Sequence, residues 1–160
     1  QGNRGAWGIG WAVWSLAAPS LVLFYDWWAA RLPAAGWARA GVLVAAAGMC
    51  CDWAGEGLLA LVLVEQADLS DFRSVQRTGT LLTAGAANGL YTIGGVLLTL
   101  RTTGCPRWVR LAIWMTWLAG AGMTVCALLD EGTGLVVSTA VLFPLLIVWV
   151  VWMALSWKAA

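Results

Sequence analysis

Two carboxylate residues lie within an otherwise apolar stretch of the chain, CCDWAGEGLLALVLV (residues 50–64). They are Asp52 and Glu56, and the preceding residues 40–49 carry no charge. A spacing of four residues places both side chains on one face of an α-helix. Carboxyl groups arranged in this way hold protons, bind a cation, or work as an acid–base pair. Which of these applies depends on the segment that carries them.

The composition and the long apolar runs indicate that this segment lies in a membrane. Of the 160 residues, 61% are hydrophobic and 11% are charged, whereas a soluble domain carries about 25% charged residues. A bilayer core requires about 20 helical residues. Five segments reach that length: 7–30, with a kink at Pro19, 40–64, 78–100, 108–129 and 135–157. We therefore predict an all-α, polytopic integral membrane protein, with residues 1–160 forming one bundle of about five transmembrane helices.

The distribution of basic residues predicts the orientation. One side of a five-span topology holds Arg31, Arg39, Arg101, Arg107, Arg110 and Lys158, and the other holds Arg4, Arg73 and Arg77. The positive-inside rule then places the N-terminus outside and the C-terminus inside, in a cytoplasmic or plasma membrane. The bilayer is the expected partner, and a second copy of the chain or another membrane protein could join it. The net charge of +1, without a basic stripe, gives no reason to expect nucleic acid.

The rare residue types exclude several kinds of chemistry. The sequence has no histidine, which removes the usual haem ligand, most catalytic zinc sites and histidine-based acid–base schemes. Its four cysteines form no C-x-x-C pair, so a thiol–disulfide mechanism has no motif behind it. We therefore expect neither a metal nor a cofactor, and interpret the cysteines as small buried hydrophobic residues.

The two intramembrane acids need neutral partners. A charged carboxylate at the bilayer centre costs about 3 kcal/mol on insertion scales, and no Lys or Arg lies at that depth. In the third span, Asn88, Tyr91 and Thr92 are spaced three and four residues apart and share one helix face. Consecutive spans are antiparallel, so their midpoints should meet. We predict one polar site built from Asp52, Glu56, Asn88, Tyr91 and Thr92, against the alternative that these groups only join helices by hydrogen bonds.

Tryptophan is unusually frequent, with 13 residues. Those near span ends, where indole rings favour the interfacial layer, are Trp7, Trp11, Trp27, Trp28, Trp37, Trp108 and Trp157. Those that lie deeper are Trp14, Trp53, Trp114 and Trp117. A buried indole either packs against its neighbours, with its N–H on an acceptor, or faces a ligand. We include Trp53, Trp114 and Trp117 in the predicted ligand-binding site, with ordinary packing as the alternative.

Three functions are compatible with these features. The first is binding or transport of a small hydrophobic or cationic ligand, or of a coupling cation, by a dicarboxylate site lined with aromatic rings. The second is an intramembrane enzyme in which Asp52 and Glu56 act as acid and base on a lipid, sterol or isoprenoid. The third is a structural subunit of a membrane complex, in which the acids meet a basic residue of a partner. We favour the first.

Overall fold

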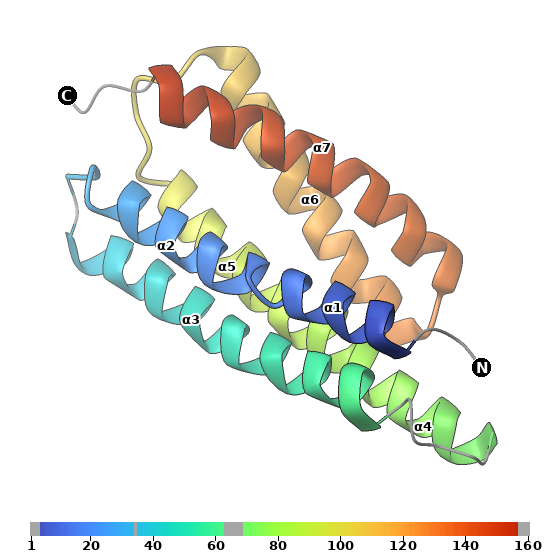
Figure 1. The fold of residues 1–160 in the computed structure, drawn as a ribbon. Helices are drawn as coiled ribbons and strands as arrows, with labels where there is room; N and C mark the ends of the chain where they lie inside the picture. The colour runs from blue at the N-terminus through green and yellow to red at the C-terminus, as the bar shows by residue number, and fades with distance from the viewer. Residues whose placement is uncertain (1–3, 34, 63–68, 157–160) are drawn as a thin grey trace.

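The computed structural model describes residues 4–33, 35–62 and 69–156, and every regular element within these ranges is helical (Figure 1). The elements are, in chain order, α1 (Arg4–Trp14), α2 (Ala17–Ala29), α3 (Ala35–Gly57), the π-helical turn η1 (Leu58–Val62), α4 (Leu69–Thr80), the π-helical segment η3 (Leu81–Ala87), α5 (Asn88–Thr99), α6 (Arg107–Leu129) and α7 (Gly132–Ser156).

Five of the continuous helical stretches are long and apolar enough to cross a membrane. They are Gly5–Ala29, Gly36–Leu61, Ser70–Thr99, Arg107–Leu129 and Gly132–Ser156. The predicted all-α bundle is confirmed, and its composition fits an integral membrane protein. The third helix begins before the predicted residue 78, because α4 continues the helix as a polar extension beyond the apolar run. The predicted ends of the second and fifth spans, residues 64 and 157, lie outside the described ranges.

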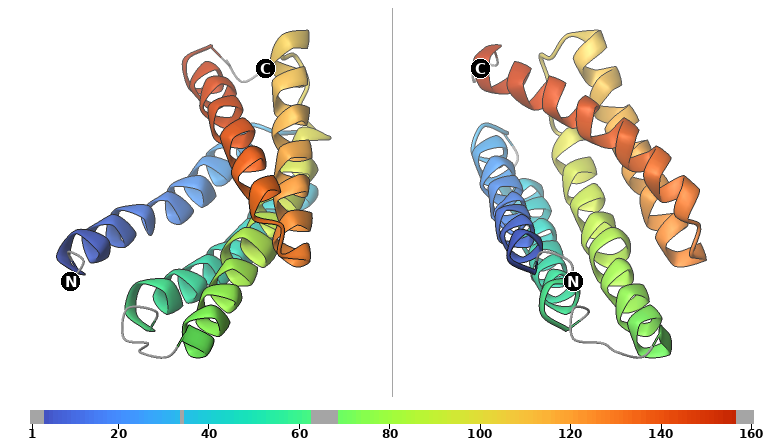
Figure 2. Two further views of the ribbon diagram at one scale, coloured as in Figure 1. Left: turned by 90° about the vertical axis from the view of Figure 1, so that its right-hand side faces the viewer. Right: turned by 45° about the vertical axis from the view of Figure 1, so that its right-hand side comes forward.

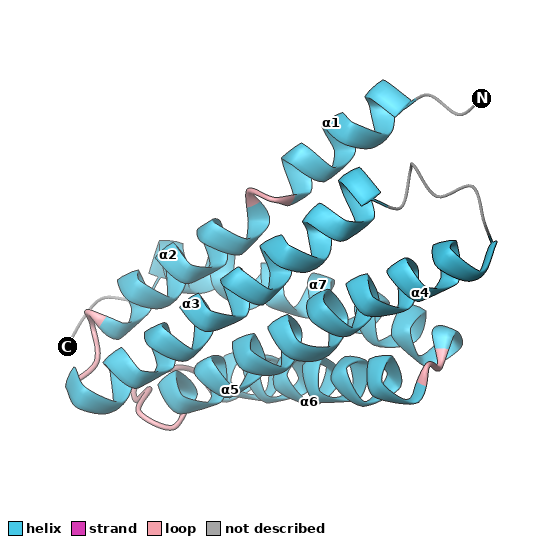
Figure 3. Cartoon of the chain, turned by 90° about the horizontal axis from the view of Figure 1, so that it is seen from below, coloured by secondary structure: helices cyan, strands magenta, loops and turns pink. Residues whose placement is uncertain are grey.

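The first span, Gly5–Ala29, contains a turn at residues 15–16, which lies one helical turn before Pro19 rather than at the proline itself. α1 ends at Trp14 and α2 begins at Ala17, with a turn between them (Figure 3). A proline has no N–H, and its ring clashes with the carbonyl four residues earlier. For Pro19 that carbonyl belongs to Ser15, so the helical hydrogen bond to Ser15 O is lost there. The effect of the proline therefore appears at Ser15.

The helices pack as two groups joined through α5. α3 lies between α2 and α5, while α6 pairs with α7 and also packs against α5 and η3 (Figures 1 and 2). α3 and α5 approach each other most closely where Gly41 faces Gly94: a Cβ on Gly94 would lie 2.6 Å from the Gly41 carbonyl oxygen. α1 leans away from the α6–α7 pair (Figure 2, left).

Aromatic rings fill the space between α2, α6 and α7. Trp149 of α7 lies 5.4 Å from Trp28 and 5.5 Å from Phe24 of α2, measured between ring centroids. Trp117 of α6 lies 5.8 Å from Trp149 and 6.4 Å from Tyr25. Edge-to-face pairs at these distances are favourable beyond the area they bury. Trp28, which the sequence places among the interfacial tryptophans, is fully buried in this aromatic cluster.

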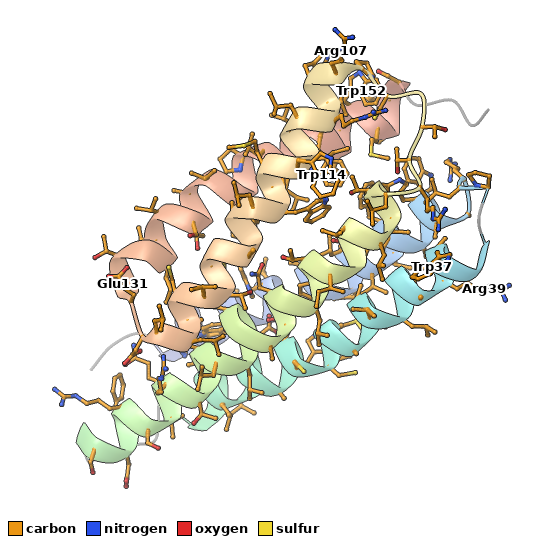
Figure 4. All side chains as sticks on the ribbon, turned by 180° about the vertical axis from the view of Figure 1, so that it is seen from behind. Trp37, Arg39, Arg107, Trp114, Glu131 and Trp152 are labelled. Atoms are coloured by element: carbon orange, nitrogen blue, oxygen red, sulfur yellow. The ribbon has the colours of Figure 1, made fainter. Side chains whose placement is uncertain are left out.

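The two ends of the bundle differ in charge. Arg39 and Arg107 lie at one end, and Glu131 lies at the other (Figure 4). At the Glu131 end, Arg77 of α4 donates hydrogen bonds to the carbonyl oxygens of Ala127 (2.6 Å) and Leu128 (2.9 Å), and it forms an ion pair with Asp130 (2.8 Å). The last carbonyls of a helix have no partner within the helix. Arg77 therefore caps α6 and ties it to α4.

This cap gives a first prediction. We expect Arg77→Ala to lower the free energy of unfolding by about 1–2 kcal/mol, because two charge-assisted hydrogen bonds to helix carbonyls are lost. We expect Asp130→Asn to cost less than about 1 kcal/mol, because an exposed ion pair contributes little and asparagine tolerates the left-handed backbone at this position. SDS titration of both variants in mixed micelles measures the difference. Equal losses would contradict the capping role.

Candidate functional site

A cavity of about 280 Å³ lies within the bundle, lined by side chains from all five long apolar helices among the described residues. Its lining residues are Trp11 and Trp14 of α1, Ala17, Ala18, Leu21 and Tyr25 of α2, Asp52 of α3, Thr83 and Ala84 of η3, Asn88, Tyr91 and Thr92 of α5, Thr116, Trp117 and Met123 of α6, and Leu142, Phe143 and Leu146 of α7. The wall is mainly apolar and aromatic, and Asp52 is the charged residue among these lining residues.

Asp52 faces the cavity from the last two turns of α3. Its Oδ2 accepts a hydrogen bond from the Tyr91 hydroxyl at 3.1 Å, and Gly48 provides the space in which the Tyr91 ring lies against α3. Among the described residues, the ion pair formed is that between Arg77 and Asp130, so Asp52 has no basic partner there. The Tyr91 phenol and the partly buried Asp52 carboxyl group thus form one hydrogen-bonded polar pair in this wall.

Glu56 lies one turn further along α3, and it does not line the cavity. Its side chain is only 2% exposed. Oε2 lies 2.5 Å from the hydroxyl oxygen of Ser15, while Oε1 is buried and has no hydrogen-bond partner. The sequence predicts Asp52 and Glu56 on one helix face, yet they meet different surroundings, because α1 covers Glu56 and leaves Asp52 open to the cavity.

The turn in the first span is held by α3. The carbonyl of Ser15, which Pro19 leaves without its helical donor, accepts a hydrogen bond from Trp53 Nε1 at 3.1 Å. The Ser15 hydroxyl lies between Glu56 Oε2 and the Trp11 carbonyl oxygen, at 2.9 Å from the latter. Irregular backbone at membrane depth persists only where other groups satisfy its polar atoms. The Trp53 indole N–H provides this hydrogen bond for the Ser15 carbonyl. Trp53 is 47% exposed and does not line the cavity.

The predicted polar face of the third span is divided between two neighbours. Tyr91 points toward Asp52 on α3, whereas Asn88 Nδ2 donates to the Gly120 carbonyl oxygen (2.6 Å) and to Thr124 Oγ1 (3.0 Å) on α6. Asn88 and Thr92 both line the cavity. The structure thus brings Asp52, Asn88, Tyr91 and Thr92 around one space, but it joins only Asp52 and Tyr91 by a hydrogen bond among these four.

The two tryptophans of α6 also separate. Trp117 lines the cavity, and its Nε1 donates to Thr99 Oγ1 at 2.8 Å. Trp114 is 41% exposed and lines a separate hollow together with Thr102 and Arg110, near the end of the bundle where Figure 4 labels it. A spacing of three residues leaves an angular difference of about 60°, which is enough to place one ring inside the bundle and the other on its outer surface.

Several lining residues were not included in the site predicted from the sequence. Tyr25 donates from its hydroxyl to the Tyr91 carbonyl oxygen at 2.9 Å and forms part of the wall, as do Trp11, Trp14 and Thr116. Ser15 does not line the cavity, but it holds the contact with Glu56. The sequence did carry a signal for it, because Ser15 is a polar residue in an apolar span, four residues before a proline. For the others, no spacing rule separates a cavity wall from ordinary packing. Within the described residues, no group of three or more His, Cys, Asp or Glu side chains is placed to hold a metal ion.

The fold and the cavity together define an all-α bundle of the integral membrane class, with an internal cavity that Asp52 lines. The chain matches no protein-family model, and comparison with curated proteins and with solved structures gives no match.

Proposed function

We propose that this protein binds, and moves across the membrane, a small hydrophobic organic cation that occupies the cavity between α1, α3, α5 and α7. One observation supports the proposal: Asp52 lines a cavity between the long apolar helices and has no basic partner among the described residues. A carboxylate in that position is costly unless it is neutralised. An ammonium group entering the cavity supplies the missing charge.

The aromatic lining supports a cation rather than a neutral lipid. Trp11, Trp14, Tyr91 and Phe143 all contribute to the wall, and Trp14 and Phe143 meet edge to face at 5.7 Å. Aromatic faces attract desolvated cations, by about 2 kcal/mol or more at buried sites. The cavity volume of about 280 Å³ lies near the lower end of the range for ligand pockets. An aromatic monoamine with a short side chain matches this size and chemistry.

The enzyme alternative has weaker geometric support. An acid–base pair requires both carboxyl groups to reach one substrate. Asp52 lines the cavity, whereas Glu56 is directed at Ser15 and is absent from the lining. The two carboxyl groups therefore do not converge on one bound molecule, and a single-carboxylate binding site accounts for the arrangement more simply.

Paired ligands provide the test. We expect the purified protein in nanodiscs to bind protonated phenethylamine and to bind its uncharged analogue, 2-phenylethanol, more weakly. Because a charge-assisted hydrogen bond contributes about 1.5–3 kcal/mol, Asp52→Asn should weaken phenethylamine binding at least about tenfold and leave 2-phenylethanol binding nearly unchanged. Equilibrium dialysis with radiolabelled ligands measures both affinities.

The matched control is Asp130→Asn, the same substitution at an exposed position outside the cavity. It should leave phenethylamine binding unchanged. Uptake of the amine into proteoliposomes then distinguishes transport from binding alone. Equal affinities for the amine and the alcohol, or amine binding that is insensitive to Asp52→Asn, would contradict the proposal.

A further inference from the structure

We infer that Glu56 is a buried proton-binding site, separate from the cavity, and that its proton holds α1 against α3 over the cavity. The inference goes beyond ligand binding and does not depend on which molecule the cavity accepts. Three features carry it: the burial of Glu56, the number of protons available at Ser15, and the turn between α1 and α2.

The hydrogen bonds at Ser15 require a proton on Glu56. Ser15 Oγ lies 2.9 Å from the Trp11 carbonyl oxygen and 2.5 Å from Glu56 Oε2, and a carbonyl oxygen and a carboxylate both only accept. A hydroxyl has one proton to donate, so an ionised Glu56 leaves one of the two contacts without a proton. When Glu56 is protonated, it donates to Ser15, and Ser15 donates to Trp11. Both bonds then form together.

The second carboxyl oxygen of Glu56, Oε1, also indicates that Glu56 is protonated. Oε1 is buried and has no hydrogen-bond partner, which a neutral carboxyl group tolerates far better than a carboxylate. Among the described residues, no basic side chain forms an ion pair with Glu56. Arg77 pairs instead with Asp130 and donates to the α6 carbonyls. An ionised Glu56 would therefore be a buried charge with one oxygen unpartnered.

None of the titratable groups on the neighbouring described elements donates a proton to Glu56 or neutralises its charge. On α3, Asp52 lies one turn away and would repel a second negative charge. On α5, the hydroxyl proton of Tyr91 is directed at Asp52. The residues of α1 from Gly5 to Trp14 and those of η3 include no titratable side chain. The titratable residues of α4 are Asp71, Arg73 and Arg77, and the side chains of Asp71 and Arg73 are exposed.

The contacts of α1 link its position to the protonation of Glu56. It is joined to α2 through a turn at residues 15–16. Hydrogen bonds between this part of the chain and the α3–η1 helix include those at Ser15 and that of Trp7 Nε1, which donates to the Leu59 carbonyl oxygen at 3.4 Å. Trp11 and Trp14 of α1 form part of the cavity wall, and α1 leans away from the α6–α7 pair (Figures 2 and 3). Loss of the proton leaves the single Ser15 hydroxyl proton to serve only one of its two acceptors, and it leaves a buried charge whose Oε1 has no partner. Water around Glu56 is then favoured, so α1 should separate from α3 and open the cavity.

Double electron–electron resonance tests this movement without any ligand. The four native cysteines are replaced by alanine, and spin labels are attached at Ile9 of α1 and Leu128 of α6, both of which are exposed. The full chain in nanodiscs is measured from about pH 5 to about pH 9. We expect the distance distribution to shift by several ångströms as the pH rises. A second label pair, Leu23 of α2 and Leu111 of α6, should not shift.

Three variants assign the shift to Glu56. Glu56→Gln cannot ionise and its amide still donates to Ser15, so the low-pH distribution should persist at every pH. Ser15→Ala removes the acceptor and should give the shifted distribution even at low pH. Asp52→Asn should retain the pH dependence. An unchanged distribution in the unmodified background, or the same shift in Glu56→Gln, would overturn the inference, and an unaltered Leu23–Leu111 distance shows that each variant is folded. Neither outcome depends on amine binding.

Discussion

We expect Trp28→Ala to lower the free energy of unfolding by about 3–5 kcal/mol, as for other large core residues truncated to alanine. Trp28 is 0% exposed and contacts three aromatic rings, those of Phe24, Tyr25 and Trp149. Its Nε1 also donates to Thr102 Oγ1 at 2.9 Å. In a membrane, packing and hydrogen bonds replace the hydrophobic effect as the force between helices. Truncation would remove both at the point where α2 meets α7.

Trp37→Ala is the matched control for this variant. Trp37 is 57% exposed, and the contact described for it is with the Arg101 guanidinium, 5.7 Å from its ring centroid. We expect its loss to cost less than about 1 kcal/mol. SDS titration of both variants in mixed micelles gives the two unfolding free energies. Similar losses would mean that the aromatic cluster does not hold the two helix groups together.

Gly94→Ala is expected to produce the second large effect, a loss of about 1–3 kcal/mol from overpacking. The new Cβ would lie 2.6 Å from the Gly41 carbonyl oxygen, and in return a Cβ on Gly41 would lie 2.9 Å from the Gly94 carbonyl oxygen. Both obstacles are backbone atoms, so no side chain can rotate to relieve the contact. Small residues allow membrane helices to approach this closely. The substitution should force α3 and α5 apart along the pair that carries Asp52 and Tyr91.

Gly8→Ala tests whether this loss reflects the contact or glycine itself. Gly8 lies within α1, and a Cβ there would meet nothing within 4 Å. Because alanine has the higher helix propensity, this change should be neutral or should stabilise by up to about 1 kcal/mol. SDS titration of the two variants, with opposite signs expected, measures the comparison. A loss at Gly8 as large as that at Gly94 would remove the close-approach explanation.

The site was partly predictable from spacing. The sequence placed Asp52, Asn88, Tyr91 and Thr92 at similar depths on consecutive helices, and all four line one cavity. It did not separate Asp52 from Glu56, because an interval of four residues gives the same helix face without indicating where a neighbouring helix ends. That separation is made by α1, which covers Glu56 and not Asp52.

The tryptophans also show that spacing along a helix predicts which residues share a face but not what that face contacts. Spacing placed Trp114 and Trp117 on one side of α6, yet only Trp117 lies in the cavity wall. Trp28 was assigned to the interfacial layer by its position near a span end, and it is fully buried. Position along a span determines the depth in the membrane. It does not determine whether a side chain faces lipid or another helix, and in a segment that is apolar on all sides the hydrophobic pattern contains no such information.

By itself, the sequence determined the class of protein and the number of long apolar helices, and it predicted two acids within one of them, since helix length and charge are local properties measured against a bilayer of fixed thickness. Only the tertiary structure decided which acid faces a cavity, which is covered by α1, and which donor takes the Ser15 carbonyl that Pro19 leaves free. These outcomes depend on how helices far apart in sequence approach one another. Close packing at small residues and hydrogen bonding of irregular backbone decide that approach.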